Sequence, residues 1–201
     1  TSTSTATVST NSMNATATTR ISRLFDRLRD ERRPALIAYL TAGDPTMEAT
    51  LPLIEALERG GADLIELGVP FSDPVADGPV IQRASERALR AGATLRGILD
   101  LVPLLRRRSD IPVLLFTYLN PALRYGWEAL AKDARERGID GCLLTDLSVE
   151  EAEQYTAAMR KHNLDTVFLA APTSTPRRLS LVASYSSGFI YLVSRAGVTG
   201  E

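Results

Sequence analysis

Short apolar runs alternate with longer amphipathic segments along most of this chain, and this alternation limits the folds that it can adopt. The apolar runs have the length of buried β-strands, whereas the segments between them repeat their apolar residues at helical spacing. One strand and one helix recur about every 25 to 30 residues, which is typical of βαβ units and a parallel sheet. The expected strands are residues 35–40, 64–67, 113–117, 141–144, 166–170 and 189–193. The expected helices begin with an amphipathic segment at Arg20 and continue with residues 47–59, 80–90, 94–107, 127–137, 150–162 and 175–185.

The connections at the two ends of the expected strands differ in composition. Loops that follow the strands hold Asp, Asn, Thr, Ser and Pro, whereas loops that precede them are plain polar turns such as residues 59–63 and 137–140. A (β/α)8 barrel, or TIM barrel, has this asymmetry because its active site lies at the carboxyl ends of the strands. A doubly wound open sheet is the alternative, but no G-x-G-x-x-G motif follows the first strand. We therefore expect an α/β fold of the TIM-barrel type.

The sequence accounts for only part of such a barrel. A complete barrel has eight strands and about 250 residues, whereas these 201 residues supply about six strands and end just after the sixth. We expect two βα units to be missing, which would leave two open sheet edges and a half-exposed core. Residues 1–19 are rich in Thr, Ser and Ala without helical periodicity, so we expect a disordered tail. Residues 20–201 are then the partial barrel domain.

The composition argues against several kinds of partner and site. A formal net charge of -1 does not favour binding to nucleic acid or to a membrane surface by charge alone, and no apolar run reaches the ~18 residues of a membrane helix. The single cysteine, Cys142, excludes an intrachain disulfide and fits a reducing compartment, so we expect a cytoplasmic protein. The single histidine, His162, argues against a His-rich metal site and a Ser/His triad, and we expect no metal.

Residues 64–79 join an apolar strand to a loop rich in acids, glycine and proline. Glu66 would project from the strand near its carboxyl end, where desolvation raises the pKa of a glutamate toward neutrality and makes it an acid or base at working pH. Asp77 lies in the loop, where we expect it to stay wetter and keep a lower pKa. Two carboxyl groups in unlike environments can divide acid and base roles. A salt-bridged structural glutamate and a turn-forming aspartate are the alternatives.

Five segments of the sequence resemble the tryptophan synthase α subunit family. The longest, residues 66–79, is similar to the family signature ELGVPFSDP-x-ADGP. The others are YLTAGDP at residues 39–45, TYLNP at 117–121, LAAPTS at 169–174 and YLVSRAGVTG at 191–200, and they follow in the family's order. The segment after Asp146 and Leu147 departs from the double proline that is usual in the family.

The resemblance implies a retro-aldol cleavage of indole-3-glycerol phosphate into indole and glyceraldehyde 3-phosphate, a step of tryptophan biosynthesis. Glu66 occupies the family's position for the general acid that protonates indole C3, and Asp77 matches the carboxylate that accepts the indole N–H. Tyr39 and Tyr118 stand at positions that line the indole pocket, and Tyr191 matches the tyrosine beside the catalytic glutamate.

The last part of the sequence resembles the mobile loop that follows the sixth strand in the family. There the threonine matched by Thr199 pairs with the loop aspartate when the site closes, and Gly200 matches a backbone donor to the substrate phosphate. The remaining phosphate donors come from loops after strands seven and eight, so we expect this chain to bind substrate weakly.

The resemblance also implies an αββα complex that passes indole to a β subunit. Pyridoxal phosphate belongs to that β subunit, and the α chain needs no cofactor. Loop residues expected to face the partner are Asp73, Pro74, Asn120, Pro121 and Asp146. Two alternatives remain open: a free-standing indole-releasing lyase that works without a β partner, and an inactive truncated fragment.

Overall fold

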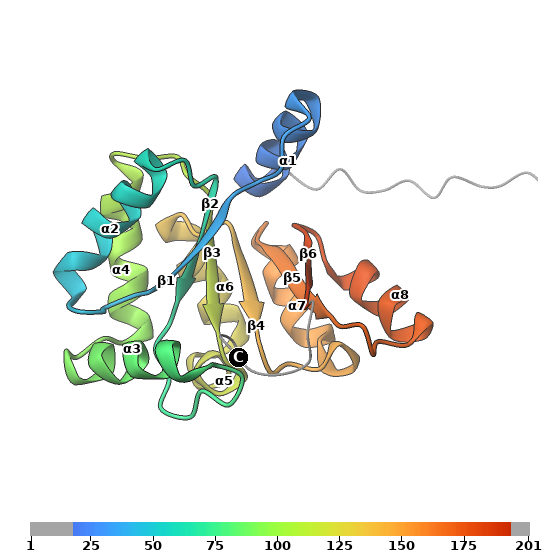
Figure 1. Ribbon diagram of the computed structural model, residues 1–201. Helices are drawn as coiled ribbons and strands as arrows, with labels where there is room; N and C mark the ends of the chain where they lie inside the picture. Colours follow the sequence, from blue (N-terminus) through green and yellow to red (C-terminus); the bar gives the residue numbers. More distant parts are fainter. Residues whose placement is uncertain (1–17, 194–201) are drawn as a thin grey trace, which may run out of the picture.

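Six parallel strands form one curved sheet in the computed structural model, which describes residues 18–193 (Figure 1). They are β1 (Ile37–Thr41), β2 (Leu64–Gly68), β3 (Val113–Thr117), β4 (Gly141–Leu144), β5 (Asp165–Ala170) and β6 (Ile190–Leu192). Each strand pairs with the next one along the chain, in the order β1-β2-β3-β4-β5-β6. This confirms the expected fold, a TIM barrel with six of its eight strands.

One helix, α1, precedes the first strand, and the other helices connect successive strands (Figure 1). They are α1 (Arg20–Glu31), α2 (Met47–Arg59), α3 (Pro79–Arg90), α4 (Leu95–Arg106), α5 (Leu119–Tyr125), α6 (Trp127–Arg137), the 3-10 turn η1 (Val149–Glu151), α7 (Glu153–Lys161) and α8 (Pro176–Tyr185). Threonine side chains accept a backbone N–H at the start of α2, α4 and α8, which satisfies a donor that the helix cannot.

Two helical regions differ from the sequence prediction. Asn120 and Pro121 were expected on a loop but lie in α5, where a proline is tolerated because the first-turn N–H groups have no acceptor within the helix. The segment expected as one helix over residues 150–162 is divided into η1 and α7. Residues three apart share a face of a 3-10 turn, so this turn buries both Val149 and Ala152.

Alternate residues of each strand point to two different cores. One core lies between the sheet and the outer helices and includes Ile65, Leu67, Val113 and Leu115. The other fills the inside of the barrel, where the strands contribute Leu64, Leu114, Leu143 and Val167. Because side chains alternate along a strand, Glu66 faces the inside together with Leu64. The inner face is therefore apolar toward the amino ends of the strands and carries a carboxyl group further along.

Helix α1 closes the amino end of the inner core, opposite to α5 (Figure 1). Its buried side chains, Ile21, Leu24 and Leu28, pack against the inner strand residues. Thr19, which the sequence analysis placed in the tail, is the N-cap of this helix, where it forms a capping box with Ser22 and donates to Asp165 Oδ2. The partial barrel therefore includes Thr19.

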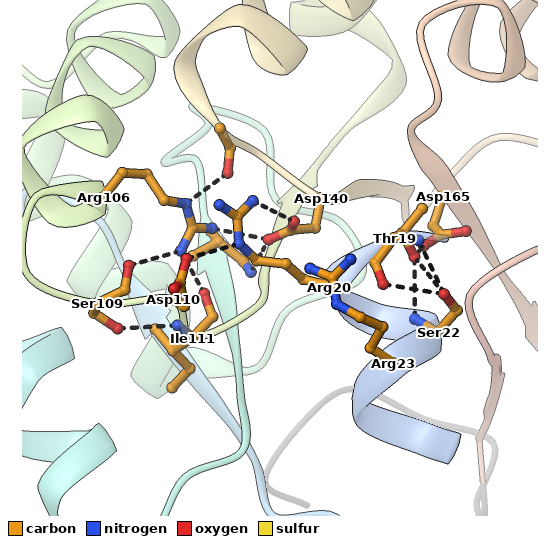
Figure 2. Close-up of polar contacts among 12 residues, drawn as sticks. Thr19, Arg20, Ser22, Arg23, Arg106, Ser109, Asp110, Ile111, Asp140 and Asp165 are labelled. Atoms are coloured by element: carbon orange, nitrogen blue, oxygen red, sulfur yellow. Dashed lines mark hydrogen bonds and ion pairs between the residues drawn. The ribbon is translucent and has the colours of Figure 1, made fainter. Parts of the chain in front are cut away.

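Asp140, a buried aspartate directly before β4, joins α1 to the sheet (Figure 2). The Asp140 carboxylate accepts Arg20 Nη1 at 3.1 Å and Arg106 Nη2 at 2.8 Å, and it also accepts the backbone N–H of Val113. Its side chain is only 1% exposed. Because the amino end is filled in this way, the carboxyl end of the inner core is left for a site.

Candidate active site

Aromatic rings from three strands line the inner face around Glu66. The register places Tyr39 of β1 directly beside Glu66 of β2. The Tyr39 and Phe116 ring centroids are 5.3 Å apart with their planes at 80°, and Phe116 lies 6.5 Å from the ring of Tyr191 on β6. Burial raises the pKa of Tyr39 and of Tyr191, and the Glu66 charge raises both further, so this carboxyl group lies near both phenols. These residues place a carboxyl group among aromatic rings on the inner face of the sheet.

Glu66 is desolvated and has an unused oxygen. Its residue surface is 5% exposed, and Oε1 is buried without a hydrogen-bond partner among residues 18–193. Burial raises the pKa of this carboxyl group to about 7. The shift expected from the strand position is therefore present, and a group with this pKa can both donate and accept a proton near neutral pH. Its catalytic role stays a prediction.

Asp77 is buried as well, so the expectation that it stays wet in its loop was wrong. It is 7% exposed, and burial raises its pKa, which a hydrogen bond from Tyr118 partly offsets. The phenol Oη of Tyr118 donates to Asp77 Oδ2 at 3.0 Å. From α3, Gln82 Nε2 donates to the Asp77 carbonyl at 2.8 Å. The end of the loop at Asp77 is thus folded against Tyr118 and α3, whereas Ser72, Asp73, Val75 and Ala76 are exposed.

The predicted residues within residues 18–193 come together at this end of the sheet. Burial is the main cause of the raised pKa of Tyr39. The charges of Asp77 and Glu66 raise it further, which places that ring near both acids. Tyr118 completes the group through Asp77. Thr199 and Gly200, expected on the loop after β6, lie outside the described residues.

Three residues that shape the pocket were missed in the sequence. Phe116 faces inward between two tyrosines. It stands two residues after Leu114 on the same strand, so alternation along the strand could have predicted its inward position. Phe71 contacts the Tyr118 ring at 5.2 Å, although nothing in the loop sequence indicates that partner. Gly68 lies under Tyr39, and a Cβ there would meet the phenol oxygen at 2.2 Å, so only glycine leaves room for this ring.

A shallow groove of about 300 Å³ lies beside the loop that carries Asp77. Its lining residues are Phe71, Ser72, Asp73, Pro74, Val75, Gln82, Glu86 and Leu89. Val75 is 75% exposed there and shares the groove with two other apolar residues, Phe71 and Leu89, so we consider it a candidate contact surface. Asp146, expected at the same surface, accepts the backbone N–H of Leu119 at 2.6 Å and so stabilises the start of α5.

Residues 18–193 contain no group of three or more His, Cys, Asp or Glu side chains that could hold a metal ion. Within the same range, every helix is too short or too polar to cross a membrane.

Comparison with known proteins identifies the family. The family model described as tryptophan synthase alpha chain matches residues 25–201. The tryptophan synthase alpha chain of Solibacter usitatus is 71% identical over 183 residues, which are 91% of this chain and 68% of the relative. The tryptophan synthase alpha chain of Geotalea uraniireducens is 53% identical over 181 residues, which are 90% of this chain and 68% of the relative.

Solved structures agree with the sequence comparison. Tryptophan synthase subunit alpha from Legionella pneumophila has a TM-score of 0.87 at 41% identity, over 89% of this chain and 68% of that one. A tryptophan synthase structure from Mycobacterium tuberculosis has a TM-score of 0.86 at 43% identity, over 92% and 71%. The family model, the identity of the relatives and the matching fold together show that this chain belongs to the tryptophan synthase alpha chain family.

Proposed function

We propose that this chain cleaves indole-3-glycerol phosphate into indole and glyceraldehyde 3-phosphate, with Glu66 as the general acid. The observation that carries the proposal is the buried Glu66 carboxyl group, whose pKa is about 7 and whose Oε1 has no partner among residues 18–193. The indole ring is a poor leaving group until C3 is protonated. An acid that is partly protonated near neutral pH and faces an aromatic pocket suits that step.

The remaining bond changes need only one further proton transfer. Once C3 carries a proton, the Glu66 carboxylate accepts the proton of the adjacent glyceryl hydroxyl. That oxygen then becomes the aldehyde carbonyl as the carbon–carbon bond breaks, and the bonding electrons return to the indole ring. Every step is an acid–base step, so the proposal assigns no metal or cofactor to this chain.

Asp77 has the second role, as the carboxylate that accepts the indole N–H. Protonation at C3 places positive charge on the ring nitrogen, and a buried carboxylate stabilises that charge strongly because little water screens it. The rings of Tyr39, Tyr118 and Tyr191 would hold the flat substrate. We assign Thr199 to closing the site over Asp77, and Gly200 to binding the substrate phosphate.

A pyridoxal-phosphate-containing β subunit is the proposed partner, in an αββα complex. The groove beside the Asp77 loop supports this because it joins an exposed apolar residue, Val75, to the loop that carries a site carboxylate. Docking there would place the partner next to the loop that carries Asp77. We also propose that the protein works in the cytoplasm, where the buried free thiol of Cys142 stays reduced.

Product formation by Glu66→Gln tests this function. The variant keeps the size of the side chain but cannot supply the proton, so we expect indole release to fall about 10²- to 10⁴-fold. Glyceraldehyde 3-phosphate should fall in parallel, because both products come from one bond cleavage. The matched control is Glu153→Gln on the exposed face of α7, which should retain the rate of the unmodified chain. Indole release by Glu66→Gln at that same rate would remove Glu66 from the mechanism.

A further inference from the structure

Tyr118 makes two hydrogen bonds to the loop that carries Asp77, both through its phenol oxygen. The O–H group donates to Asp77 Oδ2 at 3.0 Å, and the same oxygen accepts the backbone N–H of Ala76 at 3.0 Å. The residue is 3% exposed. An oxygen that donates to one residue and accepts from its neighbour fixes both the carboxylate and the backbone next to it.

The ring that makes these bonds is itself anchored to the sheet. Tyr118 directly follows β3 and is the N-cap residue of α5. On its two sides, the Thr117 carbonyl accepts the N–H of Thr145 at 3.0 Å, and the Leu119 N–H donates to Asp146 at 2.6 Å. The ring centroids of Phe71 and Tyr118 are 5.2 Å apart. Tyr118 therefore connects a rigid strand end to the loop.

Within the loop, the backbone bonds among residues 69–78 are local. Val75 N–H donates to Asp73 O at 2.9 Å, and Asp77 N–H donates to Pro74 O at 3.0 Å. Such bonds shape the turn, whereas its position is set by Val69 N–H donating to the Phe116 carbonyl at 2.8 Å, by Gln82 Nε2 donating to the Asp77 carbonyl, and by the two bonds of Tyr118. The Asp77 side chain has one bond to the rest of the described chain, the one from Tyr118, and Oδ1 accepts none from residues 18–193.

We infer that Tyr118 is a positioning residue, whose O–H holds Asp77 Oδ2 and thereby leaves Oδ1 directed toward a hydrogen-bond donor in the pocket. This role is separate from lining the pocket, which the ring performs without its oxygen. The identity of that donor as an indole N–H rests on the proposed function, whereas the hold on Asp77 does not.

The hydrogen bond also affects ionisation of the carboxyl group. Burial raises the pKa of Asp77 and the bond from Tyr118 opposes this rise, so removing the bond should raise the pKa further. The other titratable groups that face this region are Tyr39 from β1 and Glu66 from β2. Neither can carry a positive charge, so within the described chain the hydrogen bond from Tyr118 is the interaction that favours the ionised form of Asp77 against burial.

The test is Tyr118→Phe, which keeps the ring and its contact with Phe71 but removes the oxygen. We expect the Asp77 pKa, followed by carbon-13 NMR of its carboxyl group and assigned with Asp77→Asn, to rise by about one unit. The Ala76 amide loses its acceptor, so its hydrogen exchange should become about tenfold faster. The matched control is Tyr125→Phe, which removes a phenol donor from Asp133 on the outer surface and should change neither value.

These readouts separate the inference from the proposed function. They need no turnover, so they stand even if the unmodified chain releases no indole. Where turnover is measured, the acidic limb of the kcat/KM profile should move to higher pH by the same amount as the Asp77 pKa. Unchanged Asp77 ionisation and unchanged Ala76 exchange in Tyr118→Phe would overturn the positioning role.

A reciprocal variant covers the case in which Tyr118→Phe does not fold. Burial is the main cause of the raised pKa of Tyr118, and the charge of Asp77 and its hydrogen bond raise it further. Asp77→Asn leaves Tyr118 in place and should therefore lower the phenol pKa, which ultraviolet absorbance follows. A phenol that titrates at the same pH in this variant and in the unmodified chain would also overturn the inference.

Discussion

At the scale of single residues, the site depends on two buried carboxyl groups with different partners. Asp77 receives a hydrogen bond from Tyr118, which favours its ionised form, whereas Glu66 Oε1 receives none from residues 18–193. Burial alone therefore sets the pKa of Glu66 at about 7. The two carboxyl groups therefore differ in what opposes burial: a hydrogen bond favours the ionised form of Asp77, and none does so for Glu66 within the described chain, which is the kind of difference that the proposed mechanism needs.

The raised pKa of Glu66 predicts a dependence of stability on pH. The folded-state pKa lies above the unfolded value, so the stability that this group contributes is fully present below about pH 4.5 and is lost as the pH rises through about 7. Glu66→Gln has no charge to desolvate. We expect it to be more stable than the unmodified chain by about 2–3 kcal/mol at pH 8, with the difference vanishing near pH 4.

Urea unfolding of both proteins across this range measures the difference. The same variant is expected to lose activity, so stability and catalysis should change in opposite directions at this residue. A variant that is less stable than the unmodified chain at pH 8 would mean that the glutamate is a structural residue.

Much of the site could be predicted from the sequence, and one misassignment shows the limit. Glu66 interrupts an apolar strand, and the tyrosines stand in segments typical of the family, so local sequence identifies them. Asp77 stands among turn-forming residues, and its burial depends on Tyr118, which is 41 positions further along the chain. No local pattern reveals such a contact.

At the scale of secondary-structure elements, two groups of contacts decide where the site lies. Helix α1 and the Asp140 ion pairs fill the amino end of the barrel interior (Figure 2). Loops at the other end carry the polar side chains. Apolar periodicity was sufficient to predict the strands and long helices. It could not predict α5, because a seven-residue helix shows too few turns for a period to be recognised.

Removing the buried aspartate tests the first of these element contacts. Asp140→Ala leaves Arg106, a mostly buried cation, without its partner and takes away one anchor of α1. We expect a loss of about 3–5 kcal/mol in the free energy of unfolding, measured with urea.

Asp110→Ala is the matched control for this change. It removes the other carboxylate that pairs with Arg20, but this side chain is 90% exposed and its pair is screened by water. We expect it to cost less than about 1 kcal/mol. Equal effects of the two substitutions would show that burial of Asp140 does not matter.

At the scale of the whole molecule, the inner core is closed at its amino end and carries the candidate site at its carboxyl end. The six-stranded sheet has β1 and β6 as its edge strands, and the outer residues of β6, Ile190 and Leu192, are exposed. A second exposed apolar region lies in the groove beside the Asp77 loop. The groove adjoins the loop that carries Asp77, which makes it our proposed surface for a partner that receives indole.

A charge in that groove should weaken binding of a tryptophan synthase β subunit. Val75→Asp places a carboxylate where we expect an apolar contact, so the dissociation constant should rise at least about tenfold. Leu104→Asp makes the same kind of change at an exposed site on α4, away from the groove, and should leave binding unchanged. Calorimetric titration compares them. Full indole release without any measurable binding of a β subunit would instead favour a free-standing lyase.

If a protonated Glu66 drives cleavage, indole release must depend on pH in the range where this group titrates. The measurement is kcat/KM for indole-3-glycerol phosphate between about pH 5.5 and 9. Because the acid must carry its proton, the account predicts a rate that falls as the pH rises through about 7, the pKa of Glu66. A rate that stays constant or increases across that range would contradict it.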